Sequence, residues 1–262
     1  MIGAIIGDVV GSRFEFHNIK TKNFDLWHND CHPTDDTILT CAVADWLLHG
    51  GNPEKYLFAW GNKYKHIKYE NGKIPAFGPA FTNWLVSQQP YNANTNGCIM
   101  RLSPIFDFYI DDLEKMFYTA ETLTCITHNH PESVNATRAY IETGYMLKNN
   151  EPITNIKNTI SQKYNYNLFQ SVDEIRPNYN KFYCKCKNSV PQSIVCAITA
   201  NSFEDAIRNA ISLGGDSDTL ATMSCGLAEI RFGVSGDLQE KAKKYLDKNM
   251  LGTINAVTNR TK

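Results

Sequence analysis

Hydrophobic residues along most of this chain recur with the period of an α-helix. From Thr37 the apolar positions follow one another at i, i+1, i+4 and i+5, which places them along one helix face. That helix is predicted to end at Gly50 and Gly51, because glycine commonly terminates helices. The same periodicity, with capping and stop residues, predicts further helices over 131–148, 202–213, 216–232, 53–69, 111–124 and 237–248.

Strand signals are sparse by comparison. No β-branched stretch alternates long enough to predict a strand. The segment from Thr154 to Asn188 is polar and poor in aliphatic residues, so we expect a long connection there with one short helix. A chain of 262 residues is long enough to enclose one large core. The sequence therefore predicts an all-α fold in a single domain over 1–262.

Charge and composition exclude several classes of partner. The formal net charge is −1, which provides no field that would recruit nucleic acid or an anionic membrane. No apolar run approaches the roughly 20 residues that a bilayer span requires. The eight cysteines are scattered, and the single C-K-C at Cys184 and Cys186 is not a zinc spacing. We therefore expect free thiols in a reducing compartment and a cytoplasmic protein.

Two clusters of acidic residues each precede a strongly amphipathic helix. They are Thr34-Asp35-Asp36 and Asp216-Ser217-Asp218-Thr219. Either cluster alone is explained by ordinary capping, because Asp is a favoured residue at a helix start. If the two clusters converge, their like charges repel and burial disfavours ionisation, so a cation between them is expected.

Hard divalent cations suit these side chains best. Mg²⁺ and Mn²⁺ take oxygen ligands from carboxylates, hydroxyls and water. Four aspartates and two threonines are too many for one ion but suit two ions about 3.5–4 Å apart. Zinc is less apt, because its preferred Cys and His ligands are missing from both clusters, although His32 lies near the first.

Several spaced motifs together resemble those of the ADP-ribosylglycohydrolase family. In chain order they are Gly3-x-x-x-Gly7-Asp8-x-x-Gly11-x-x-x-Glu15, Thr34-Asp35-Asp36-Thr37, Asn96-Gly97 with Met100-Arg101 and Pro104, Thr127-His128, and Gly214-Gly215-Asp216-Ser217-Asp218-Thr219. The resemblance extends from residue 3 to about residue 233 and keeps the family's order.

This resemblance implies an orthogonally packed multi-helix domain with a binuclear Mg²⁺ or Mn²⁺ cleft. It implies one set of metal ligands: Thr34, Asp35, Asp36, Asp216, Asp218 and Thr219. Glu15 matches the acidic residue on the family's mobile N-terminal loop. Asn96, Gly97 and His128 match positions that contact ADP-ribose.

One stretch of this chain departs from the family's pattern. Thr95 stands where relatives carry the first glycine of Gly-Asn-Gly, and threonine tolerates positive φ poorly. Ala93 and Asn94 occupy positions where relatives often have an aromatic or small polar residue. We therefore expect adenine to stack on another ring, such as Tyr91 or Phe77.

The function implied by the resemblance is hydrolysis of the glycosidic bond between ADP-ribose and an acceptor. The substrate would be an ADP-ribosylated protein or a small-molecule conjugate, and two metal ions would assist attack by water at the anomeric carbon. Asp35 or Asp36 would take the proton of that water, and Glu15 would orient the leaving side or share in proton transfer. Two alternatives remain open: another two-metal nucleotide hydrolase, and a non-catalytic ADP-ribose-binding module. The acceptor and the oligomeric state are not specified by the sequence.

Overall fold

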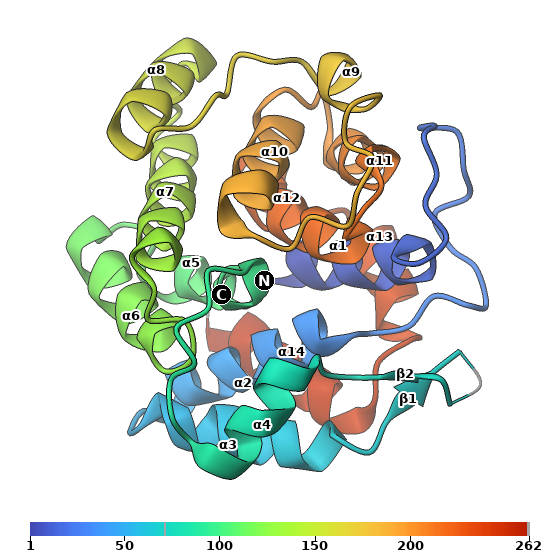
Figure 1. Ribbon diagram of the computed structural model, residues 1–262, viewed down its shortest axis with the longest axis vertical. Helices are drawn as coiled ribbons and strands as arrows, with labels where there is room; N and C mark the ends of the chain where they lie inside the picture. Colours follow the sequence, from blue (N-terminus) through green and yellow to red (C-terminus); the bar gives the residue numbers. More distant parts are fainter. Residues whose placement is uncertain (71, 261–262) are drawn as a thin grey trace.

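The computed structural model describes residues 1–70 and 72–260, and its regular secondary structure is almost entirely helical (Figure 1). The all-α prediction is therefore confirmed. The α-helices are α1 (Ile2–Gly11), α2 (Asp35–His49), α3 (Pro53–Tyr64), α4 (Pro79–Ser87), α5 (Pro104–Tyr109), α6 (Leu113–Cys125), α7 (Pro131–Lys148), α8 (Ile153–Tyr164), α9 (Val172–Ile175), α10 (Cys186–Ile198), α11 (Phe203–Leu213), α12 (Ser217–Phe232), α13 (Gly236–Lys243) and α14 (Lys248–Arg260). The other elements are the 3₁₀ turns η1 (Ser12–Phe14) and η2 (Asn96–Cys98) and the antiparallel pair β1 (Lys68–Tyr69) and β2 (Ile74–Pro75).

Helices α1 and α12 pack closely at the centre of the molecule, between α10–α11 on one side and α2, α3 and α14 on the other (Figure 1). Glycines on α1 permit this close approach. A Cβ added at Gly7 would lie 2.3 Å from the Ala221 carbonyl oxygen, and one at Gly11 would lie 2.6 Å from the Asp218 Cα. Since glycine carries no Cβ, the C-terminal end of α1 reaches the N-terminal turn of α12.

Four of the predicted segments form helices close to the predicted bounds. The helices predicted from residues 37, 131, 202 and 216 are present as α2, α7, α11 and α12. The Ser202 hydroxyl accepts the Asp205 N–H at 3.0 Å, as a capping box requires. The Asp205 carboxylate accepts the N–H of Asn201 instead of Ser202, so the box is only half formed. The segment predicted from residue 53 is helical only to Tyr64, because the chain then enters β1.

The segment 154–188, predicted as a long connection with one short helix, contains the short helix α9 but also a longer helix at its start, so the prediction is wrong in its first part. Helix α8 occupies Ile153–Tyr164 and packs on α7. Its buried residues Ile156, Ile160 and Tyr164 are spaced by four, which is a helical stripe one residue wide. The average composition of the segment is polar, and this concealed the narrow stripe.

Other helices were not predicted from the sequence. These are α1, α4, α5, α10 and α14. Helix α1 is buried from Gly3 to Gly11, so it has no polar face to alternate with an apolar one. Helix α10 contains Pro191, which usually argues against a helix interior.

The β1–β2 hairpin lies beside the first acidic cluster. The Tyr69 hydroxyl donates a hydrogen bond of 2.6 Å to the carbonyl of Pro33, the residue before Thr34. The hairpin is thereby attached to the start of α2. Within residues 1–70 and 72–260, no helix is both long and apolar enough to cross a bilayer.

The α1–α12 contact can be tested with one pair of alanine substitutions. Gly7→Ala is expected to lower the free energy of unfolding by about 1–3 kcal/mol, because the new methyl group would overlap the α12 backbone. Gly252 occupies an exposed position of α14 with open space around its Cβ, so Gly252→Ala is expected to raise the free energy of unfolding by up to about 1 kcal/mol. Urea unfolding of both variants measures the difference. Equal effects would contradict close packing at Gly7.

Candidate functional site

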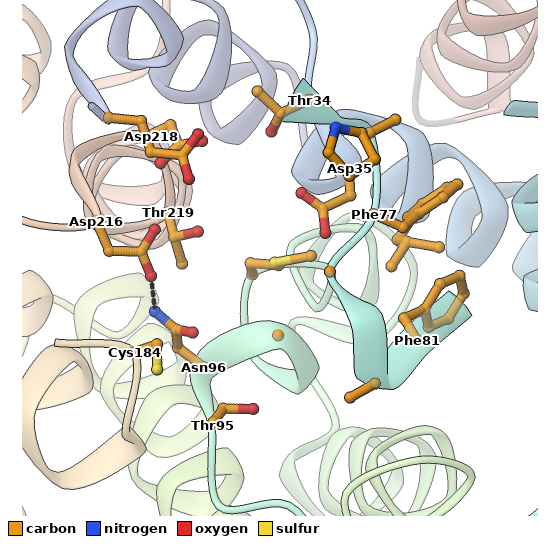
Figure 2. A pocket seen from close by; sticks show the side chains of 18 of the residues that line it. Thr34, Asp35, Phe77, Phe81, Thr95, Asn96, Cys184, Asp216, Asp218 and Thr219 are labelled. Carbon is orange, nitrogen blue, oxygen red and sulfur yellow. Dashed lines mark hydrogen bonds between the residues drawn. The ribbon is translucent and has the colours of Figure 1, made fainter. Parts of the chain in front are cut away.

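A cavity of about 400 Å³ opens where the N-terminal ends of α2 and α12 approach each other. Figure 2 shows Thr34 and Asp35 on one side of it, and Asp216, Asp218 and Thr219 on the other. The Thr95–Gly97 turn and the segment from Ile74 to Phe81 complete its walls.

The two acidic clusters predicted from the sequence lie against each other. Thr219 Oγ1 donates a hydrogen bond of 3.1 Å to Asp36 Oδ2, which joins the start of α12 to the start of α2. Thr34 Oγ1 lies 3.4 Å from the same oxygen. Asp35 lines the cavity, whereas Asp36 is buried with 1% exposure. Residues about 180 positions apart in the chain therefore share one site.

Carboxylates gather at this site in two groups. One oxygen each of Asp8, Asp36 and Asp218 lies within 4.8 Å of the others, and so does one oxygen each of Glu15, Asp216 and Asp218. Asp218 belongs to both groups. Two neighbouring sets of oxygen atoms that share a carboxylate are the arrangement expected for a pair of divalent cations.

Asp8 is a member of this site that the sequence reasoning did not include. Its Oδ2 accepts the N–H groups of Thr34 at 2.9 Å and Thr37 at 3.0 Å, and its Oδ1 accepts the Thr34 hydroxyl at 2.6 Å. Asp8 on α1 thus caps the first turn of α2 from a neighbouring helix and sets its orientation. The available signal was an aspartate inside the apolar run of residues 2–11.

Burial raises the pKa of every carboxylate in these groups, and the charges of neighbouring acids raise it further for Glu15, Asp36 and Asp218. Burial, with Asp8 and Asp216 nearby, raises the pKa of Asp35 to about 8. Burial, with Asp216 and Asp35 nearby, raises the pKa of Glu15 to about 9. Burial also raises the pKa values of four other aspartates: Asp8, Asp36, Asp216 and Asp218. A divalent cation would reverse this preference for the protonated forms.

Two of these carboxylates have one oxygen atom that is free to coordinate a ligand. Asp36 Oδ1 and Asp218 Oδ1 are buried and have no hydrogen-bond partner in the described part of the chain. An unpaired buried oxygen is costly, and coordination by a cation would satisfy it. The donor set consists of carboxylates and hydroxyls, which fits Mg²⁺ or Mn²⁺ better than zinc.

Asn96 connects the 95–97 turn to the acidic groups. Its side-chain amide donates a hydrogen bond of 2.6 Å to Asp216 Oδ2 (Figure 2), and its backbone N–H bonds to the Cys184 carbonyl at 2.8 Å. Thr95 is extended, with φ −104° and ψ 160°. The threonine at this position therefore imposes no positive-φ strain, and the turn forms without the family's first glycine.

His128 lies behind this turn and lines the cavity with 3% exposure. Its Nε2 lies 2.9 Å from Thr95 Oγ1 and its Nδ1 lies 2.7 Å from Thr127 Oγ1. Burial and the nearby Arg101 lower the pKa of His128 to about 3, so the ring is neutral. Its hydrogen bonds hold Thr95 in place beside Asn96 and Gly97.

Aromatic rings form much of the opposite wall. Phe77 and Phe81 lie beside Asp35, with their ring centroids 4.9 Å apart (Figure 2). Tyr91 meets His128 edge to face, with centroids 5.0 Å apart. Phe77 and Tyr91, the two rings expected from the sequence to stack on adenine, both line the cavity.

The acidic site predicts an unusual dependence of stability on pH. A folded pKa of about 8 for Asp35, against 3.8 in the unfolded chain, means that the folded state holds the proton more tightly. The contribution of Asp35 to the free energy of unfolding is therefore fully present below about pH 4 and is lost as the pH rises through 8. In chelator we therefore expect the free energy of unfolding to fall between pH 5 and pH 8, and Asp35→Asn to recover about 1–2 kcal/mol at pH 8.

Urea unfolding at each pH, with Asp237→Asn on the exposed surface of α13 as the control, measures this effect. Mn²⁺ should stabilise the wild-type chain most at pH 8, because a cation binds the deprotonated carboxylates. A metal-free stability that rises between pH 5 and pH 8 would contradict the electrostatics described here.

Two known proteins are similar to this chain. A relative from Pseudomonas putida (strain GB-1), the ADP-ribosylarginine hydrolase Tri1, is 26% identical over 281 aligned positions, which cover 93% of this chain and 72% of the relative. A solved structure described as an ADP-ribosylglycohydrolase-related protein complex matches with a TM-score of 0.70 and 16% identity, over 100% of this chain and 97% of that chain. That structural likeness shows the fold alone. The sequence model of the ADP-ribosylglycohydrolases matches residues 1–260, and this protein therefore belongs to the ADP-ribosylglycohydrolase family.

Proposed function

We propose that this protein hydrolyses the bond between ADP-ribose and an acceptor, using two Mg²⁺ or Mn²⁺ ions. The observation that carries the proposal is the pair of carboxylate groups that share Asp218 at the wall of the cavity. Family membership supports ADP-ribosyl hydrolysis as the reaction class. The carboxylate geometry and the family thus both favour hydrolysis of an ADP-ribosyl bond.

The metal ligands we propose are those expected from the sequence: Thr34, Asp35, Asp36, Asp216, Asp218 and Thr219. The unpartnered oxygens of Asp36 and Asp218 support the assignment most directly. Asp8 is assigned a positioning role, because three donors from Thr34 and Thr37 already occupy its oxygens. When bound, such ions supply positive charge at the reacting centre and lower the pKa of a coordinated water.

The remaining roles follow from where the carboxylates face. Of the two candidate bases, Asp35 is favoured because it lines the cavity, whereas Asp36 Oδ2 is engaged by Thr219 and Thr34. Asp35 would accept the proton of the attacking water at its carboxylate. One carboxylate oxygen of Glu15 lies within 4.8 Å of oxygens of Asp216 and Asp218, so Glu15 would orient the leaving side or share in proton transfer.

The ADP-ribose would lie along the 95–97 turn and the aromatic wall. Backbone N–H groups of a turn suit the diphosphate, and Phe77 or Tyr91 offers a ring for adenine. Asn96 is held by Asp216 and by the Cys184 carbonyl, so it would contact the substrate from a rigid position. His128 would contribute by fixing Thr95.

Arginine is the acceptor we favour. Its support is the relative whose name is an ADP-ribosylarginine hydrolase. Arginine conjugates would be N-glycosides, and serine conjugates would be O-glycosides with a different leaving group. Assays with both kinds of conjugate therefore decide which acceptor this cleft takes.

A panel of ADP-ribosylated substrates tests the proposal. Arginine-, serine- and nucleotide-linked conjugates would be incubated with Mg²⁺, with Mn²⁺ and with chelator, and free ADP-ribose would be measured. We expect release of ADP-ribose from the arginine conjugate only when a divalent ion is present. Release of phosphate instead would identify another two-metal hydrolase, and ADP-ribose binding without any release would identify a binding module.

Asp218→Asn tests the shared carboxylate. Turnover should fall by at least about a thousandfold and Mn²⁺ binding should weaken, because both groups lose one charged oxygen ligand. The metal-free variant should be as stable as the wild type or more so, since one repelling charge is removed. Asp237→Asn serves as the surface control, and calorimetry with Mn²⁺ gives the binding. Normal turnover in Asp218→Asn would refute the assigned role.

A further inference from the structure

Two phenylalanines from distant segments stack on each other at the rim of the cavity. Phe16 follows Glu15 in the loop after η1, and Phe182 lies in the loop before α10. Their ring centroids are 6.0 Å apart and their planes differ by 3°. Both rings line the cavity, yet each remains about half exposed, at 50% for Phe16 and 49% for Phe182. Exposed apolar rings at a reaction cleft suggest a binding role.

The loops that carry these rings are fixed to the same turn of the acidic site. The Asn18 side chain donates to the carbonyls of Glu15 at 3.0 Å and Gly215 at 2.9 Å, and it accepts the Gly215 N–H at 2.8 Å. Gly215 has φ +72°, and a Cβ there would lie 2.9 Å from the carbonyl oxygen of Lys181. The residues next to Phe16 and Phe182 therefore pack against the turn that presents Asp216.

This stacked pair and the Phe77–Phe81 wall belong to different parts of the cleft. Phe77 and Phe81 lie beside Asp35 and are 2% and 6% exposed (Figure 2). That enclosed wall suits the ADP-ribose part, which is common to every substrate. An acceptor that is a side chain of another protein must leave the cleft toward solvent, and the half-exposed rings beside Glu15 lie on such a path.

The chemistry of this rim fits one kind of acceptor. Aromatic faces attract planar cations, and guanidinium groups stack on them more readily than small neutral groups do. Glu15 adds a carboxyl group next to Phe16, and the charged residues that line the cavity are four acids, Glu15, Asp35, Asp216 and Asp218, and the fully buried Arg101. The two rings are parallel and each is about half exposed, so part of each ring remains open to a ligand.

We propose that Phe16 and Phe182 form the acceptor subsite of this cleft and recognise the guanidinium of an ADP-ribosylated arginine. The inference rests on the proposed function and deepens it, because it assigns acceptor specificity to residues of this chain. Phe182 is the better residue to vary, since Phe16 is bonded directly to Glu15.

The test separates the acceptor from the ADP-ribose. Phe182→Leu removes the aromatic face and keeps an apolar side chain, Phe182→Tyr keeps the ring, and Phe169→Leu alters an exposed phenylalanine that does not line the cavity. For Phe182→Leu we expect the KM for ADP-ribosylarginine to rise about fivefold with little change in kcat. The KM for the serine conjugate should change less than twofold, and Phe182→Tyr and Phe169→Leu should behave as the wild type.

Binding measured without turnover keeps this test independent of the proposed reaction. In a Glu15→Gln background, calorimetry with Mn²⁺ present would give Kd values for ADP-ribosylarginine and for free ADP-ribose. We expect Phe182→Leu to weaken the first about fivefold and to leave the second unchanged. If Phe182→Leu weakens binding of ADP-ribosylarginine and of free ADP-ribose equally, the rings contact ADP-ribose and not the acceptor. If it weakens the binding of neither ligand, the rings take no part in recognition. Either result overturns the proposed subsite. A wild-type chain that releases no ADP-ribose, while the two Kd values still diverge, would refute the hydrolase and not the subsite.

Discussion

The burial of several like-charged carboxylates at one place is the constraint on which this structure depends. Asp36, Asp216 and Asp218 are each less than 7% exposed, and they lie at the first turns of α2 and α12. Helix N-termini partly offset this repulsion, because their free N–H groups and dipoles favour negative charge. The offset is incomplete, as the raised pKa values show. The buried carboxylates thus destabilise the folded chain, and bound cations would remove this destabilisation.

The packing at the centre of the fold makes this arrangement possible. Gly7 and Gly11 bring the backbone of α1 against that of α12, and Asp8 on the same helix holds the first turn of α2. One helix therefore orients both acidic turns. A change in α1 would move the carboxylates relative to each other, which links the stability of the core to the geometry of the site.

A second set of interactions builds the rest of the cleft around the acids. Asn96 joins the 95–97 turn to Asp216, and His128 supports that turn through Thr95. Asn18 joins the Glu15 loop to Gly215. The 95–97 turn and the Glu15 loop are thus each tied by hydrogen bonds to the turn that carries Asp216. Substrate-facing groups held in this way lose little freedom on binding, which is an advantage for positioning a reacting bond.

Local sequence determined the parts of this protein that depend on neighbours along the chain. Helical periodicity and capping residues predicted α2, α7, α11 and α12, and the acid pairs at two helix starts predicted where charge would gather. The sequence alone missed α1, whose surface is apolar on nearly all sides, and α8, whose apolar stripe is one residue wide. Only the tertiary structure decided that Asp8 caps a different helix and that Phe16 stacks on Phe182. Those contacts join segments that are separate in the chain, so no spacing or propensity encodes them, and they form only when the helices pack.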